Sequence, residues 1–273
     1  MNPEKIKFTK MHGLGNDFIM IDKETNPNLQ LNDAFIKSIC DRKYGIGCDQ
    51  LIIYSSISHD VEVFNQDASK AAACGNATRC LGKLLIKGDE KIALSFGNRK
   101  VTVSGNSGDY CADMGEANYK KLAYNITPAF SLKNIYEPQS SDYINEINFV
   151  NIGNNHSIIF VPDIARFNLA KIGEIIENDP SLPARSNVSL AQITSKNHIK
   201  LATWEIGAGL TEACGTGACA AAFAAYKNSL VEASNIEVLF NSGSIIINIL
   251  ANNHVEMLGP TNLVFQGEYY LSH

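Results

Sequence analysis

One segment of the sequence, Ala213–Lys227, is apolar at nearly every position. It reads ACGTGACAAAFAAYK, so a cysteine and a Gly-Thr-Gly turn precede an alanine-rich run. Alanine has the highest helix propensity, and a helix without a polar face belongs in the interior of a domain. We therefore predict a buried helix with Cys214 at its N-terminus, where the helix dipole favours a thiolate and the N–H groups can bind an anion.

Shorter apolar and alternating runs predict strands through much of the remaining chain. In the first half we expect a helix from the N-cap Asn32 through Cys40, and a segment at Ala71–Lys87 that resembles the alanine-rich one. The strands are predicted at Ile6–Thr9, Phe18–Asp22, Leu51–Ser55, Val61–Asn65, Ile92–Phe96 and Val101–Ser104. The last two of these strands form a hairpin around Gly97-Asn98.

The second half of the chain repeats landmarks of the first half in the same order. Four pairs recur at offsets of 138–144 residues: Gly15-Asn16 with Gly153-Asn154, Phe64-Asn65 with Trp204-Glu205, Cys74-Gly75 with Cys214-Gly215, and Phe96 with Phe240. Four ordered matches with so little drift favour an internal duplication. Each half is then predicted to contain many short strands and one buried central helix.

The boundary between the halves is expected in the polar, proline-containing stretch Tyr119–Tyr143. We place the N-terminal half at residues 1–118 and the C-terminal half at 119–263. Equivalent elements of duplicated halves can face each other across their interface, a common place for a ligand cleft. On this expectation two helix N-termini, each with a thiol, point at one small volume.

Composition and charge exclude several classes of protein. The chain has 273 residues, of which 45% are hydrophobic and 19% charged, and its net charge of −5 is mild, with scattered Lys and Arg. These values indicate a globular protein and argue against a nucleic-acid surface or a membrane partner. No apolar run has the length of a signal peptide or a membrane span. Seven cysteines without regular spacing favour reduced thiols in the cytoplasm.

Most of the other cysteines and histidines are predicted to be structural. Cys80 and Cys219 lie further along the two helices and are expected in the core, whereas Cys40, Cys48 and Cys111 show no partner pattern. The cysteines and histidines do not form the closely spaced pairs of a zinc site, so we expect no metal.

Two facing thiols can move a proton from one side of a carbon to the other. One acts as thiolate and the other as thiol, and this inversion requires no cofactor. The carbanion formed beside a carboxylate is stabilised by backbone N–H groups at helix N-termini. We therefore expect the substrate carboxylate to be held at the first residues of the two helices, and His156 and Glu205 to set which thiol is charged. The expected carboxylate-binding residues are Gly75, Asn76, Gly215 and Thr216.

These residues lie in motifs that resemble the diaminopimelate epimerase family along nearly the whole chain. The motifs are KMHGLGNDF, GIGCDQ, CGNATRC, NIGNNH, RSNVSLAQ and WEIGAGLTEACGTGACA. The resemblance implies a cofactor-independent enzyme that inverts one centre of diaminopimelate, from LL to meso, in lysine and peptidoglycan-precursor synthesis. It also implies an α/β (α+β) fold of two similar halves, each a mostly antiparallel barrel around a central helix, with residues 264–273 crossing back to the first half. Several family members are homodimers, so a homodimer is expected.

Carried over by position, the resemblance makes Cys74 and Cys214 the acid–base pair and places His156 and Glu205 near them. The positions matching substrate-binding residues are Asn16, Gln50, Asn65, Asn154, Asn187 and Glu205.

The sequence departs from the family pattern at four positions. Ile206 follows Glu205 where the family has an arginine that would hold the distal carboxylate, and Asn155 stands where the family has proline. Ala68 and Ala77 replace usual glycines. Isoleucine cannot replace a bidentate cation. Either another cation such as Arg185 binds the distal carboxylate, or binding is weak, or the substrate lacks this group.

Three functions therefore stand at this point. The first is an epimerase of diaminopimelate, and the second is a racemase for a different amino acid on the same fold. The third belongs to another class, a thiol-based redox or binding protein that joins Cys74 and Cys214 in a reversible disulfide. Exchange of a substrate α-proton with solvent separates the first two from the third.

Overall fold

The structure, a computed structural model, describes residues 5–71, 74–106, 109–126, 144–232 and 234–271. It contains two compact units: unit 1 comprises Met1–Ala112 and Gly259–His273, and unit 2 comprises Asp113–Leu258. Both are rich in strands and each has a central helix, which confirms the predicted α+β class with two similar halves. The predicted domain limits, after residues 118 and 263, stay predictions.

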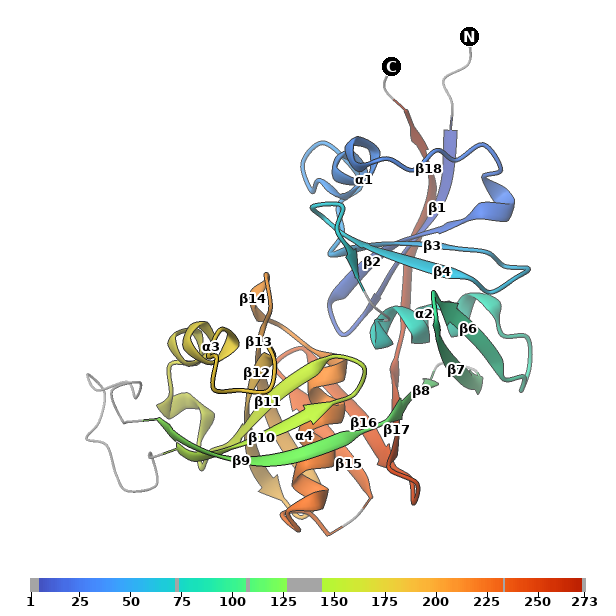
Figure 1. Ribbon diagram of the computed structural model, residues 1–273. Coiled ribbons are helices and arrows are strands. Elements are labelled where there is room, and N and C mark those ends of the chain that lie inside the picture. Colours follow the sequence, from blue (N-terminus) through green and yellow to red (C-terminus); the bar gives the residue numbers. More distant parts are fainter. Residues whose placement is uncertain (1–4, 72–73, 107–108, 127–143, 233, 272–273) are drawn as a thin grey trace. The chain divides into compact units, whose positions relative to one another are not determined.

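Unit 1 is built on a six-stranded sheet with one helix on each face (Figure 1). Strands β2 and β3 are parallel, and the other neighbours are antiparallel. In spatial order the strands are β18 (Asn262–Tyr270), β1 (Lys5–Gly13), β2 (Asn16–Asp22), β3 (Gln50–Tyr54), β4 (Val61–Asn65) and β5 (Lys70–Ala71). The helices are α1 (Asp33–Cys40) and α2 (Gly75–Leu85), with a short 3-10 turn η1 (Lys23–Thr25) after β2.

Strand alternation explains the two helix layers. On β2, Phe18 and Met20 pack in the cluster that holds α2, whereas Ile19 and Ile21 pack in the cluster that holds α1. Both faces of this strand are covered, so its four central residues, Phe18 to Ile21, are all apolar instead of alternating with polar residues. Helix α1 begins as predicted, because the Asn32 side chain accepts a hydrogen bond from the backbone N–H of Phe35 at 2.9 Å.

Three further strands follow α2, and the first two cover it. They are β6 (Ile92–Phe96), β7 (Arg99–Asn106) and β8 (Asp109–Glu116), and all neighbours are antiparallel. Leu94 and Val103 pack with Cys80 and Leu81 of α2. A Cβ on Gly82 would approach Val103 Cγ2 to 2.7 Å, so the helix passes β7 too closely for any side chain. Strand β8 crosses the division between the units.

Unit 2 wraps a longer path of strands around its central helix, α4 (Gly215–Lys227) (Figure 1). Helix α3 (Leu169–Glu177), preceded by the 3-10 turn η4 (Ile164–Arg166), packs against β11 and β12 through a separate cluster. In spatial order the strands are β17 (His254–Pro260), β16 (Gly243–Ile249), β15 (Asn235–Phe240), β13 (His198–Glu205), β12 (Asn187–Ser195), β11 (Asn155–Phe160), β10 (Ile144–Asn151) and β9 (Asn118–Ile126), with β14 (Gly209–Thr211) beside β13.

Helix α4 is buried along almost its entire length, as its sequence predicts. Every residue from Gly217 to Ala225 is buried, and the helix contacts β10, β11, β12, β13, β15 and β16. The expected barrel is not closed, because the path of paired strands ends at β9 within the described residues. The alanines allow strands to approach the helix closely on several sides, so partial wrapping already buries it.

The order of elements within the two units confirms the internal repeat. In each unit an antiparallel pair is followed by a helix, a parallel strand, an antiparallel strand, a short strand, the central helix and a hairpin. The turns before Asn16 and Asn154 both contain a glycine at positive φ, Gly15 at 85° and Gly153 at 97°, a conformation that favours glycine. The parallel pairing of β13 with β15 is reduced in unit 1 to a single bridge between Asp60 and Ser95.

Strands β4 and β6 have the predicted limits, whereas β1, β2 and β7 are longer than predicted and β3 lies one residue earlier. A strand not predicted from the sequence, β9, occupies the first residues of the stretch in which the boundary is expected. Within the described residues it pairs with β10 alone, and the side chains of residues 118–124 are all partly or fully exposed, so its sequence is polar. Residues 127–143 lie outside the described residues. No helix in the described part of the chain is long and apolar enough to cross a membrane.

Ala68 has a backbone conformation that suits the glycine of the family pattern. Its φ is 71°, a left-handed value that costs roughly 1–2 kcal/mol for a residue with a Cβ. We expect Ala68→Gly to raise the free energy of unfolding in urea by about 0.5–1 kcal/mol. Ala77→Gly is the matched control, because Ala77 lies buried inside α2, where the same change destabilises by about 1 kcal/mol. Equal effects at the two positions would contradict this account.

Candidate active site

The predicted site residues of unit 1 gather at one end of its sheet, where α2 begins. Asn16 starts β2, Gln50 starts the parallel strand β3, and Asn65 ends β4, which pairs with β3 directly opposite Gln50. Cys74 is the N-cap residue of α2, and Gly75 and Asn76 form its first turn.

Asn16 connects two of these residues, Cys74 and Asn76, to Asp49 through its side-chain amide. Its Oδ1 accepts hydrogen bonds from the Cys74 thiol at 3.8 Å and from Asn76 Nδ2 at 3.3 Å. Its Nδ2 donates to Asp49 Oδ2 at 3.0 Å. The Cys74 side chain makes no capping hydrogen bond to α2, so its thiol is directed to an amide oxygen rather than to the helix N–H groups. Asp49 was missed in the sequence, although it directly precedes Gln50 in GIGCDQ.

A second amide pair lies beside this cluster. Gln50 Nε2 donates to Asn65 Oδ1 at 3.0 Å, and Asn65 Nδ2 donates to Ser69 Oγ at 3.0 Å. Both side chains are partly exposed at the strand ends. These bonds fix the direction of both amides and leave their other polar edges available for a polar ligand.

Unit 2 repeats the arrangement with different side chains. Cys214 is the N-cap residue of α4, and Gly215 and Thr216 form its first turn. Asn154 precedes β11, Asn187 starts the parallel strand β12, and Glu205 ends β13. In each unit the site residues therefore come from equivalent strand ends next to the central helix.

The Cys214 thiol lies within a hydrogen-bonding cluster of its own. The backbone N–H of Gly217 donates to Cys214 Sγ at 3.4 Å, and Thr216 Oγ1 lies 3.6 Å from the same sulfur. A Cβ on Gly217 would lie 3.3 Å from this sulfur, so glycine allows the close approach. Asn154 Nδ2 in turn donates to Thr216 Oγ1 at 3.3 Å.

The expectation that the helix N-terminus lowers the pKa of Cys214 was wrong in its net effect. Burial raises the pKa of Cys214 well above its ordinary value, and the negative charge of Glu205 raises it further. The hydrogen bonds from Thr216 and Gly217 act in the lowering direction but are weaker. Cys214 therefore holds its proton at neutral pH.

His156 lies on β11, fully buried, and connects to Cys214 through Asn154 and Thr216. Burial lowers the pKa of His156 to about 3, so its ring is neutral at neutral pH. Asn154 donates to Thr216 and presents its oxygen to His156 Nε2 at 3.1 Å, which places the ring proton on Nε2. Nδ1 has no hydrogen-bond partner among the described residues. His156 therefore contacts the Asn154 side chain and reaches Cys214 through Asn154 and Thr216.

Glu205 and Ile206 are both held in place at the end of β13. Thr211 Oγ1, which was not predicted from the sequence, donates to Glu205 Oε1 at 2.5 Å. The backbone N–H of Ile206 donates to Asn187 Oδ1 at 2.9 Å. The Ile206 side chain is 38% exposed, so it contributes little to the core and its position tolerates a longer polar residue.

Arg185 is paired within unit 2. Its Nη2 donates to Oε1 of the buried Glu177, and Trp204 Nε1 donates to the other carboxylate oxygen at 2.7 Å. This carboxylate holds Arg185 two residues before Asn187. An additional role of Arg185 toward a substrate carboxylate stays a prediction.

The remaining cysteines contain one contact that their spacing does not reveal. Cys80 and Cys219 are buried in the helices, as expected. Cys40 and Cys48, read as structural, lie together in the core, and the Cys48 thiol donates to Cys40 Sγ at 3.4 Å. They stand eight positions apart across the end of α1, a spacing without a recognised pattern. All seven cysteines are thiols.

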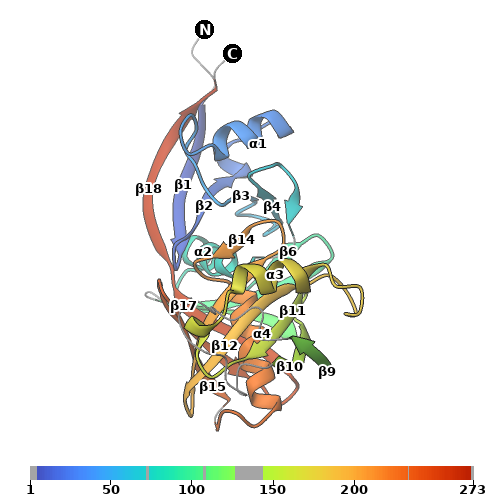
Figure 2. The same ribbon diagram turned by 90° about the vertical axis from the view of Figure 1, so that its left-hand side faces the viewer.

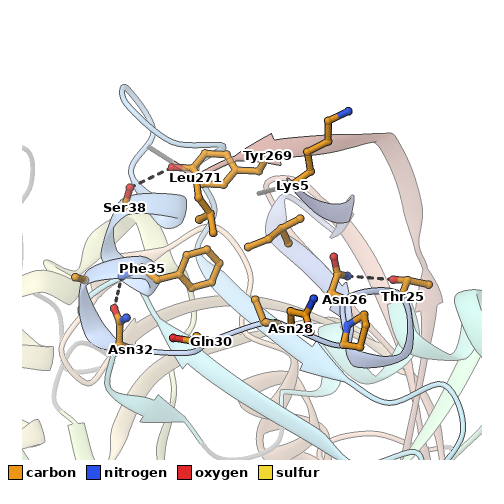
Figure 3. A pocket seen from close by; sticks show the side chains of 14 residues that line it. Lys5, Thr25, Asn26, Asn28, Gln30, Asn32, Phe35, Ser38, Tyr269 and Leu271 are labelled. Atoms are coloured by element: carbon orange, nitrogen blue, oxygen red, sulfur yellow. Dashed lines mark hydrogen bonds between the residues drawn. The ribbon is translucent and has the colours of Figure 1, made fainter. Parts of the chain in front are cut away.

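A cavity of about 570 Å³ in unit 1 lies away from the predicted site (Figure 3). It is lined by α1, the chain before it and the ends of β1 and β18, including Phe35, Asn26 and Tyr269. None of the predicted site residues lines it. Among the described residues, no group of three or more His, Cys, Asp and Glu side chains is placed to hold a metal ion.

The fold of the chain is that of known epimerases and related proteins. A hydroxyproline epimerase from Agrobacterium vitis superposes with a TM-score of 0.66 at 10% identity, covering 98% of this chain and 93% of that one. A phenazine biosynthesis protein of the PhzF family from Bacillus anthracis superposes with a TM-score of 0.70 at 11% identity, over 98% and 100% of the two chains. The two α+β units of this chain therefore have the fold of these proteins.

Sequence comparison defines the family. The profile of the family described as diaminopimelate epimerase matches residues 8–120 and 148–264. The chain is 41% identical to the diaminopimelate epimerase of Pelagibacter ubique over 267 residues, which cover 94% of this chain and 96% of that protein. It is 38% identical to the diaminopimelate epimerase of Zymomonas mobilis over 266 residues, or 96% of each. The chain belongs to the diaminopimelate epimerase family.

Proposed function

We propose that this protein is an isomerase that interconverts LL- and meso-diaminopimelate through the thiols of Cys74 and Cys214. Family membership supports the epimerase activity. The observation that carries the mechanism is the repeated placement of a cysteine at the N-cap of each central helix, beside amide side chains from equivalent strand ends. The reaction moves one proton and leaves the oxidation state of the carbon unchanged, so it requires no redox cofactor.

In the proposed reaction a thiolate removes the α-proton, and the electron pair of the broken C–H bond passes into the adjacent carboxylate. The second thiol returns a proton to the opposite face of the same carbon, which inverts the centre. The first-turn backbone N–H groups at Gly75, Asn76, Gly215 and Thr216 stabilise the negative charge on the carboxylate. Asn16, Gln50, Asn65, Asn154, Asn187 and Glu205 position the rest of the substrate.

The two thiols differ before substrate binds. Cys214 is fully buried and lies near the charge of Glu205, so it keeps its proton. Cys74 is partly exposed, and we propose that it ionises first and supplies the thiolate. A chain with one thiolate and one thiol is the active form for both directions of the reaction.

The proposed function is tested by incubation with LL-diaminopimelate in deuterated water. We expect meso product with one deuterium at the inverted α-carbon, detected by mass spectrometry and proton NMR. Absence of exchange with diaminopimelate, together with exchange on another amino acid, would assign the chain to a racemase of different specificity. Absence of exchange on any amino acid, with a Cys74–Cys214 disulfide that cycles on reduction, would favour a redox protein.

The charge of Glu205 predicts a shift in the pH profile. In the pH profile, kcat/KM falls on the alkaline side when the second thiol, Cys214, ionises. The raised pKa of Cys214 places this alkaline limb of the profile at high pH. Glu205→Gln removes a negative charge that disfavours the thiolate, so the pKa falls and the limb moves to lower pH. Glu212→Gln is the control, because Glu212 is an exposed neighbouring carboxylate. An unchanged limb in Glu205→Gln would show that Glu205 does not act on Cys214.

We also infer that the enzyme is a cytoplasmic homodimer. Reduced thiols suit the cytoplasm. Strand β18 has β1 as its one described neighbour (Figure 2), and its Leu263, Val264 and Phe265 are 44–52% exposed. An apolar edge strand of this kind suits a second copy of the chain. Light scattering should give a dimer for the native chain and a monomer for Val264→Lys, and a monomeric native chain would contradict the inference.

A further inference from the structure

We propose that Asp49 is a positioning residue that acts through Asn16 to hold the proton on Cys74. The inference deepens the proposed function and rests on it, because it concerns the readiness of Cys74 to ionise. Asp49 lies outside the motif positions matched to the substrate, and it belongs with Asn16 and Cys74 to unit 1.

The hydrogen bond between Asn16 and Asp49 can have only one donor, the Asn16 amide nitrogen. An ionised carboxylate only accepts hydrogen bonds, so Asn16 must turn its Nδ2 toward Asp49 Oδ2, 3.0 Å away. The amide oxygen of Asn16 then faces the opposite way, toward Cys74. Without a group that only accepts, an amide can rotate by half a turn and present its N–H groups to the sulfur instead.

Arg79, at the other end of this hydrogen-bonded cluster, favours the same orientation of the Asn16 amide. The guanidinium of the fully buried Arg79 only donates, and its Nη2 donates to Asn76 Oδ1 at 3.0 Å. Asn76 must therefore present its Nδ2 to Asn16 Oδ1, at 3.3 Å. A relay runs from Arg79 through Asn76 and Asn16 to Asp49, with a cation at one end and an anion at the other.

Asp49 is itself firmly held, although its side chain is 39% exposed. Its Oδ1 accepts from Arg42 Nη2 at 2.6 Å, and its Oδ2 also accepts from the backbone N–H of Asp17 at 3.0 Å. The hydrogen bonding is reciprocal, because Asp17 Oδ1 accepts from the backbone N–H of Asp49 at 2.9 Å. Lys10 and Arg42 both bond to Asp17. Burial alone would raise the pKa of Asp17, but these bonds outweigh it and hold the pKa well below the ordinary range.

The consequence concerns the balance between the two proposed bases. An oxygen that accepts from the Cys74 S–H stabilises the thiol and not the thiolate. Burial and Glu205 make Cys214 hold its proton, so a similar preference at Cys74 brings the two proton affinities closer together. Matched affinities let each thiol act both as acid and as base. The charged and titratable groups around this cluster are Arg79 and Cys80 on α2, Lys10 on β1, Asp17 on β2, and Arg42 with Asp49 before β3.

The test measures ionisation of Cys74 directly, by its rate of alkylation with iodoacetamide as a function of pH. Peptide mass spectrometry separates Cys74 from the other cysteines. Asp49→Ala removes one of the two groups that direct the Asn16 amide, and we expect the midpoint pH of alkylation to fall by roughly half to one unit, as for the loss of one net hydrogen bond. Asp49→Asn keeps an acceptor oxygen at this position but can also donate, so it should lower the midpoint by less than Asp49→Ala.

A double-mutant cycle separates positioning from general damage. Asn16→Ala should lower the midpoint by itself, and adding Asp49→Ala to it should change the midpoint no further. Asp41→Ala is the control for damage to the loop, because Asp41 accepts from the backbone N–H groups of Lys43 and Tyr44 and makes no bond to Asn16. It should leave the midpoint unchanged.

Two results would overturn the inference: a native midpoint in folded Asp49→Ala, or an undiminished effect of Asp49→Ala in the Asn16→Ala background. Circular dichroism establishes that each variant is folded. The readout does not require turnover, so it is independent of the proposed function. Were Cys74→Ser fully active, the proposed function would fail, while the alkylation cycle would still report on Asp49.

Discussion

Cys74→Ser and Cys214→Ser should each lower kcat for inversion by roughly 10²–10⁴-fold, the usual contribution of a positioned acid or base. A serine hydroxyl at either N-cap position is nearly isosteric with the thiol but ionises far less readily. The local hydrogen bonds to Asn16 and to Gly217 can still form. The loss should therefore appear in kcat much more than in KM.

The two variants should also differ from each other in a way that a single-base mechanism does not allow. With one thiol left, a proton can be removed from one face of the α-carbon and returned to that face. Each variant should therefore exchange the α-proton of only one stereoisomer with deuterated water. The two variants should prefer opposite stereoisomers. Exchange of both isomers by one variant would contradict two thiols on opposite faces.

Cys111→Ser is the matched control for these variants. Cys111 lies on β8, partly exposed, and pairs with Ser104 in the β7–β8 ladder. The same chemical change there should leave kcat and KM unaltered. A tenfold loss in this control would show that thiol replacement harms the protein as a whole.

Ile206→Arg should lower KM for diaminopimelate by about tenfold to a hundredfold with little change in kcat. A charged hydrogen-bonding partner for an anion contributes roughly 1.5–3 kcal/mol, and the distal carboxylate does not take part in the chemical step. The fold accepts the change, because Ile206 is 38% exposed and its backbone N–H, not its side chain, bonds to Asn187.

Ile206→Gln separates charge from polarity, since it adds hydrogen-bonding groups without a cation. It should give a much smaller gain than arginine. An Ile206→Arg variant with unchanged or weaker binding of diaminopimelate would favour the alternative left open by this position, a substrate without the distal carboxylate. Steady-state kinetics on diaminopimelate and on amino acids with apolar side chains would then identify the preferred class.

Local pattern predicted the fold well where neighbours in sequence are neighbours in space. The hairpin of β6 and β7 has a turn residue pair and alternating strands, and α1 has a capping asparagine, so both were found. One edge of β1, from Lys5 to His12, pairs with β18, more than two hundred residues later, and no local signal carries this information. Strand β9 was missed because it lies at the end of the described path of strands and its exposed side chains give it a polar sequence.

The sequence grouped the candidate site residues of each unit but did not predict their electrostatics. The repeat pointed to Cys74 and Cys214 and to the amides at the strand ends. The sequence signal at Cys214 is the helix N-terminus, which lowers a thiol pKa, whereas the larger opposing effects come from burial and from Glu205. Asp49 and Thr211 support predicted residues through contacts across strands or turns, which residue spacing alone does not reveal.

The pairing of β18 with β1 has a consequence for synthesis of the chain. Residues 113–258 form one continuous unit, whereas unit 1 includes residues 259–273. As the polypeptide leaves the ribosome, β1 appears long before its partner β18, so the six-stranded sheet cannot be complete until residues 262–270 have been made. Unit 2 can therefore finish folding before unit 1, although most of unit 1 is made first.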